Sequence, residues 1–232
     1  DEAGTALTTG DANVAVGFSA LKTEDAHGFN TAIGYESLKT LNAGADAYNT
    51  AVGFRAGLAV TTGVQNTFIG GNSAISNTTG GSNVGVGYRS LISNTTASNN
   101  TAVGTSALAE NTTGTAETAV GKSALAANTT GTDNTGLGAL ALLANTTGSN
   151  NVAVGRSALQ ANTTANFNTA VGKDALITNT TGVENVAIGA LALDANTTAA
   201  NNVAVGVEAM TSNTTGTQNA AVGKAALAAN TT

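Results

Sequence analysis

The chain of 232 residues contains no cysteine, no proline and no tryptophan, and it has a single histidine. Without cysteine the chain forms no disulfide bond and offers no thiolate for chemistry. One histidine, His27, argues against a metal cluster and against a histidine-based nucleophile system. We expect His27 to lie in a solvated loop, and we expect no catalytic residue, no cofactor and no bound metal.

Aromatic and charged residues are also scarce, at 3% and 9% of the chain. A core must therefore be built from Ala, Val and Leu, and the charge is too low for a self-repelling, disordered chain. The eight Lys and Arg residues are scattered singly, so no basic stripe for nucleic acid is present. The longest apolar run, Ala139 to Ala144, is too short to span a bilayer.

What the chain has instead is a repeat. A Val-Gly or similar pair returns every 17 residues, except for one step of 19. Thirteen copies carry its glycine, at Gly17, Gly34, Gly53, Gly70, Gly87, Gly104, Gly121, Gly138, Gly155, Gly172, Gly189, Gly206 and Gly223. A strict short period indicates one structural unit stacked many times, with no single globular core.

Numbered from its first Asn, the unit reads N-[T/V]-A-V-G-x-x-A-L-x-x-N-T-T-G-x-x, as in residues 100–116. Positions one to four predict a short strand, which the glycine at position five ends. The Asn-Thr-Thr-Gly run is turn chemistry, and the Ala-Leu segment is too short for a stable helix. The sequence therefore predicts an all-β parallel solenoid of about thirteen coils, roughly 60 Å long at the usual strand spacing.

Side chains alternate between the faces of a strand, so positions two and four share one face and position three lies on the other. We expect the Val/Ile column of position four and the Leu column of position nine to form the core. The alanines of position three would then form a small apolar outer face that needs a partner surface. The predicted assembly face includes Ala102, Ala119, Ala153, Ala170, Ala187 and Ala204.

Two columns of asparagine run through the repeat. The Asn of position one, broken only by Glu117, predicts an internal ladder of paired amides. The Asn-Thr-Thr asparagines fit the N-glycosylation sequon, although coils about 4.8 Å apart would crowd the sugars and favour a stacked turn instead. These possible sites are Asn77, Asn94, Asn111, Asn128, Asn145, Asn162, Asn179, Asn196, Asn213 and Asn230, and Asn99 starts an eleventh match.

The organisation along the chain is uneven at its ends. Residues 1–12 form a lead-in without a full repeat, and residues 13–65 are more charged first coils that resemble a cap. Residues 66–232 form the regular repeat, which we expect to be uncapped at its C-terminal end. An exposed coil of this kind could join another copy head to tail.

The run Asn-x-Ala-Val-Gly-x-x-Ala-Leu, over residues 13–232, resembles the head repeats of YadA-like trimeric autotransporter adhesins. It is also similar to the NTAVGxxALxxNTTG arrays of bacterial surface proteins and phage tail fibres. The resemblance implies left-handed parallel β-rolls wound in a parallel homotrimer, located outside the cell or on a cell or virion surface. It implies a rigid fibre as the product of assembly.

Three function classes follow. The first is a structural shaft of an extracellular fibre, built by repeat stacking and by association of the chain with itself. The second is an adhesin head that binds a surface ligand through the variable residues at positions six and seven, among them Lys122, Arg156 and Glu208. Ice binding through stacked threonines is a third class, which adjacent threonines favour less because strand neighbours face opposite ways. An enzyme is the class that the sequence supports least.

Overall fold

A computed structural model describes residues 2–231 and shows an all-β parallel solenoid. Each coil contributes one three-residue strand, and the rest of the coil is turns and bends without helix in the described residues. The strands are Val14–Val16 (β1), Thr31–Ile33 (β2), Thr50–Val52 (β3), Thr67–Ile69 (β4), Val84–Val86 (β5), Thr101–Val103 (β6), Thr118–Val120 (β7), Thr135–Leu137 (β8), Val152–Val154 (β9), Thr169–Val171 (β10), Val186–Ile188 (β11), Val203–Val205 (β12) and Ala220–Val222 (β13).

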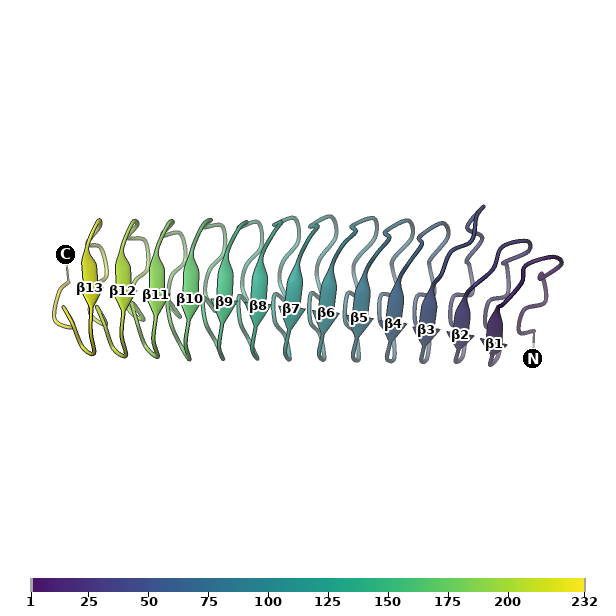
Figure 1. The fold of residues 1–232 in the computed structure, drawn as a ribbon, viewed down its shortest axis with the longest axis horizontal. Helices are drawn as coiled ribbons and strands as arrows, with labels where there is room; N and C mark the ends of the chain where they lie inside the picture. The colour runs from purple at the N-terminus through teal and green to yellow at the C-terminus, as the bar shows by residue number, and fades with distance from the viewer. Residues whose placement is uncertain (1, 232) are drawn as a thin grey trace. The chain divides into compact units, whose positions relative to one another are not determined.

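The chain divides into two compact units after Ala116. In the first unit β1 to β6 pair in chain order, all parallel, and in the second unit β7 to β13 do the same (Figure 1). Equivalent residues of successive coils stand opposite each other, as Ala153 does with Ala170. The longer second coil keeps this register, because Ala32 still pairs with Ala51.

Backbone hydrogen bonds join the coils well beyond the strands. In the fifth coil, Val84 N–H donates to the Asn100 carbonyl at 2.8 Å and Leu91 N–H donates to the Ala107 carbonyl at 3.0 Å. Within the coil, Asn94 N–H closes a turn on the Leu91 carbonyl at 3.1 Å. Such ladders satisfy backbone groups of turns that would otherwise have to face water.

The position-five glycine is required for two reasons. Gly87 has a φ of 135°, and a Cβ there would lie 2.6 Å from the carbonyl oxygen of Gly104 in the next coil. Only glycine combines that dihedral angle with such a close coil-to-coil approach. The corner predicted from the sequence is therefore confirmed.

The interior of each coil is narrow and is filled by a few fixed columns. The leucines of position nine, such as Leu108, Leu125 and Leu159, are 0% exposed. They adopt the left-handed backbone region, with φ near 50° at Leu108 (49°) and Leu125 (51°). This conformation is uncommon for a residue with a side chain, and the ladders on both sides of the turn hold it.

One expectation about the strand faces is reversed. The position-three alanines point inward, and Ala102, Ala119, Ala153, Ala170, Ala187 and Ala204 are all 0% exposed. The Val/Ile column of position four points outward, with Ile33, Ile69 and Ile188 about two-fifths exposed. The Leu column is in the core as predicted, but the Val/Ile column is not. The coil is too narrow to place a β-branched side chain opposite leucine, so alanine takes the inner place.

Phe68 shows how tightly the interior volume is conserved. This phenylalanine replaces alanine at position three of its coil and is 0% exposed. In the preceding coil, Gly57 occupies the position of the leucine column, and the Phe68 ring fills the space that a leucine side chain would take. A Cβ added at Gly57 would lie 3.0 Å from the ring. On the other side the ring lies against Gly85 of the next coil. A large residue in one column is matched by small residues beside it, as close packing requires.

We predict that Phe68→Ala lowers the free energy of unfolding by about 3–5 kcal/mol, because the neighbouring glycines cannot fill the cavity. Thermal and denaturant unfolding followed by circular dichroism would measure it. Phe167→Ala is the matched control, because Phe167 is 58% exposed. Equal losses in the two variants would contradict the packing role of Phe68.

Candidate functional site

The first asparagine column, formed by position one, is an interior ladder. Each side-chain oxygen accepts the backbone N–H of the next asparagine, as between Asn66 and Asn49 at 2.9 Å and between Asn83 and Asn66 at 3.0 Å. The amide nitrogen of Asn66 also donates to the Gly80 carbonyl at 2.9 Å. The ladder predicted from the sequence is confirmed, and its role is to pair polar groups inside the coil.

The second asparagine column consists of the Asn-Thr-Thr asparagines, and it forms a second ladder beside the first. Asn94 Nδ2 donates to Asn77 Oδ1 at 2.7 Å, and Asn162 Nδ2 donates to Asn145 Oδ1 at 2.8 Å. The same nitrogen turns back to its own coil, from Asn162 to the Ala165 carbonyl at 3.1 Å. The column is interrupted at Asn196, whose buried Oδ1 has no hydrogen-bond partner.

For most sequons this ladder supports the stacked turn and argues against glycosylation. A glycan would have to bond to Nδ2, the atom that points inward and donates to the ladder. Nine sequon asparagines are 0% exposed: Asn77, Asn94, Asn111, Asn128, Asn145, Asn162, Asn179, Asn196 and Asn213. Asn230 is half-buried and donates to Asn213 Oδ1 at 3.3 Å. The exposed sequon asparagine among the described residues is Asn99.

The prediction that the position-three alanines form an assembly face is also wrong, because these side chains point into the coil. The position-three alanines are fully buried inside the coil, so they offer no surface to another chain. The outward face of the sheet carries the Thr or Val of position two and the Val, Ile or Leu of position four. Its half-exposed residues include Val120, Leu137 and Val152.

The threonines of the turn differ from each other. The first, as in Thr78, donates its hydroxyl to the carbonyl of Thr95 in the next coil at 3.0 Å. The second, as in Thr79, is exposed. In most pairs, therefore, the first hydroxyl is committed to the ladder and the second faces solvent.

Aromatic side chains gather on the outside of the first coils. Phe18, Tyr35 and Phe54 stack ring on ring with centroids 5.4 Å apart, and the guanidinium of Arg55 lies 5.1 Å from the Phe54 centroid. Stacked rings cover one another's faces, which are the surfaces a sugar would use. The arrangement stabilises neighbouring coils by aromatic and cation–π contacts.

Glu117 replaces asparagine in the first column and is 1% exposed. Its two carboxyl oxygens accept the side chain of Asn134 at 3.0 Å and the backbone N–H of Asn134 at 3.2 Å. Burial raises the pKa of Glu117 to about 8, the hydrogen bonds from Asn134 lower it, and nearby Asp133 adds a smaller upward contribution. Glu117 is therefore neutral at pH 7 and takes the place of a neutral amide.

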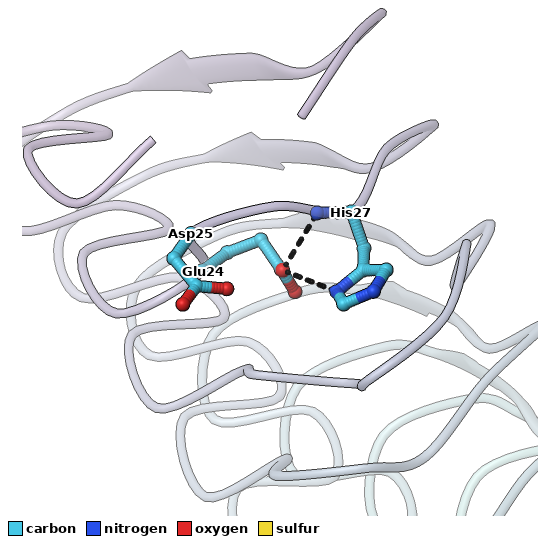
Figure 2. Close-up of side chains that lie close together, drawn as sticks. All are labelled: Glu24, Asp25 and His27. Atoms are coloured by element: carbon cyan, nitrogen blue, oxygen red, sulfur yellow. Dashed lines mark hydrogen bonds and ion pairs between the residues drawn. The ribbon is translucent and has the colours of Figure 1, made fainter. Parts of the chain in front are cut away.

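The first coil holds a cluster of polar side chains that was not predicted from the sequence. Glu24 stands at the position of the second asparagine column, followed there by Leu41 and Val60 in the next two coils. Its side chain is 0% exposed, and its oxygens accept His27 N–H at 3.2 Å and Ala43 N–H at 3.3 Å. Figure 2 shows this carboxylate aimed at the His27 imidazole, with Asp25 beside it.

The cluster brings three potential metal-ligating side chains together, two carboxylates and one imidazole. Nδ1 of His27 lies 3.4 Å from Glu24 Oε1, and the ligand atoms of Glu24, Asp25 and His27 all lie within 4.8 Å of one another. His27 lies in a loop, as expected, but its side chain is only partly exposed, at 28%. The sequence feature that could have indicated this cluster is the Glu-Asp-x-His run, because the other coils have an uncharged residue at the position of Glu24.

Comparison with models of known protein families and with curated proteins finds no match to this chain. The described residues form no helix that is long and apolar enough to cross a membrane. The molecule is a parallel β-solenoid of 17-residue coils with interior asparagine ladders.

We predict that Asn162→Asp lowers the free energy of unfolding by roughly 2–6 kcal/mol, because two buried acceptors lose their donor at about 1–3 kcal/mol each. Asn150→Asp is the control, since Asn150 is exposed and aspartate tolerates its φ of 59°. Denaturant unfolding compares the variants. A loss for Asn162→Asp no greater than for the control would refute the structural role of the ladder.

The raised pKa of Glu117 makes stability depend on pH. The folded chain holds this proton more tightly than the unfolded chain, so the contribution of Glu117 is fully present below the unfolded pKa near 4.5. It is lost as the pH rises through about 8. We expect Glu117→Gln to raise the unfolding temperature at pH 9 and to change it little at pH 4.

The test is the difference between wild type and variant at each pH, which removes the contributions of other groups. Glu110→Gln is the control, because Glu110 is exposed. A wild-type-minus-variant difference that does not change between pH 4 and pH 9 would show that Glu117 is not held neutral by burial.

Proposed function

We propose that this chain is a structural segment of an extracellular fibre, formed by parallel association of the chain with copies of itself. The observation that carries the proposal is the outward face of the sheet. Its position-four column is Val, Ile or Leu in every coil and stays partly exposed, to about two-fifths at Ile69, Val120 and Ile188. Within each unit, an exposed apolar stripe of this kind is typical of an interaction site.

The regular spacing of the stripe argues for its occupant. Successive coils repeat at the spacing of paired strands, about 4.8 Å. A partner with a different spacing would fall out of register after a few coils, whereas a second copy in parallel orientation matches at every coil. A globular ligand would cover only part of such a stripe.

The interior supports a mechanical role. From Asn66 onward the coils repeat the same backbone ladders and, with interruptions at Glu117 and Asn196, the two asparagine columns. Stiffness along the stack would come from the backbone bonds and the two asparagine columns. The similarity of the repeat to trimeric adhesin heads and to tail-fibre arrays favours three chains and a location at a cell or virion surface.

Three lysines on the outward face test the proposal. Val120→Lys, Leu137→Lys and Ile188→Lys together place charge on the stripe without entering the core, since these residues are 37–40% exposed. We expect the wild type to sediment as a homo-oligomer and the triple variant as a folded monomer. Analytical ultracentrifugation measures mass, and circular dichroism checks the fold.

The matched control places three lysines at the exposed turn threonines Thr130, Thr147 and Thr198. This control has the same added charge, so it should remain oligomeric. A wild type that is monomeric at high concentration, or a loss of assembly in both variants, would refute the outward stripe as the assembly surface.

A further inference from the structure

We propose that Glu24, Asp25 and His27 form a binding site for one divalent transition-metal ion of the Zn²⁺ class. The site lies in the first coil, within the first unit, and it is separate from the outward stripe. Its ligands would be a carboxylate oxygen from each acid and Nδ1 of the imidazole.

The first argument is the state of the two facing atoms. Nδ1 of His27 is buried and has no hydrogen-bond partner, although it faces Glu24 Oε1. A carboxylate oxygen is an acceptor, so an unprotonated Nδ1 beside it is also an acceptor facing an acceptor. The two atoms therefore need either a proton or a cation between them.

The separation of the atoms suits a metal better than a proton. A charge-assisted hydrogen bond would bring nitrogen and oxygen to about 2.7–2.9 Å, and the observed separation is 3.4 Å. Two ligands bonded to one tetrahedral Zn²⁺ at about 2.0–2.1 Å lie roughly 3.4 Å apart. The backbone-held pair therefore already has the spacing of two metal ligands.

The surroundings of Glu24 explain why a cation would be favourable there. The carboxylate is fully buried, and the next residue of its column is the buried Leu41. Its hydrogen bonds are two backbone contacts longer than 3 Å, from His27 and Ala43. A bound dication would neutralise the buried charge, which burial otherwise penalises.

Asp25 completes the donor set from the solvent side. Its side chain is exposed, so it can rotate toward the ion without disturbing the core. Imidazole with two carboxylates favours Zn²⁺, Co²⁺ or Mn²⁺ over Ca²⁺ and Mg²⁺, which prefer more oxygen ligands. With three protein ligands, the fourth position is left for water.

Isothermal titration of the chelator-treated full chain with ZnCl2 tests the site. We expect one Zn²⁺ per chain, an affinity that excess Ca²⁺ does not reduce, and a higher unfolding temperature with Zn²⁺ because the ion binds the folded state. His27→Gln should weaken Zn²⁺ binding at least tenfold. Co²⁺ should give the visible absorption of a tetrahedral site in the wild type but not in His27→Gln.

Two further variants separate loss of the metal site from misfolding and from a general loss of negative charge. Asp25→Asn changes an exposed residue and should also weaken binding without unfolding the coil. Asp46→Asn is the control: Asp46 is exposed, accepts Gly28 N–H at 3.0 Å and lies outside the cluster, so Zn²⁺ affinity should be unchanged. Unaltered Zn²⁺ binding in His27→Gln, absence of Zn²⁺ binding to the wild type, or equal loss in Asp46→Asn would overturn the proposal.

Discussion

The hydrogen bond from one coil to the next is the interaction on which the rest of this structure depends. The strands are only three residues long, too short to hold a sheet by themselves. The bonds continue around the turns, from Leu91 to Ala107 and along both asparagine columns. A turn that would otherwise be a mobile loop becomes part of the ladder. This explains how leucine is held at a positive φ in coil after coil.

The narrow interior follows from the short coil and sets rules for every column. Alanine and leucine face each other because larger pairs do not fit, and Phe68 is accommodated where glycine occupies adjacent places. The interior is also partly polar, so each amide must find a partner inside the coil. Two glutamates test that rule in different ways. Glu117 fits by keeping its proton, whereas Glu24 faces an imidazole whose Nδ1 has no hydrogen-bond partner.

The two proposed functions use different features of the coil. Assembly draws on what every coil shares, the half-exposed column of position four. Metal binding draws on what one coil alone has, the Glu-Asp-x-His departure from the repeat. A repeat protein of this kind can thus carry a local site wherever one coil deviates without losing its backbone ladder.

The sequence by itself determined the period, the parallel solenoid, the glycine corner, the leucine column and the asparagine ladder of position one. These follow from local chemistry repeated at fixed spacing. The tertiary structure alone decided which strand face is inward, because alternation in a strand defines two faces but not their direction. The valine and isoleucine of position four were expected inside, but beside the leucine column the interior of most coils has room only for the alanine of position three. The tertiary structure also decided that the sequon asparagines are buried and that His27 lies beside Glu24. Both depend on how a turn folds back over the interior.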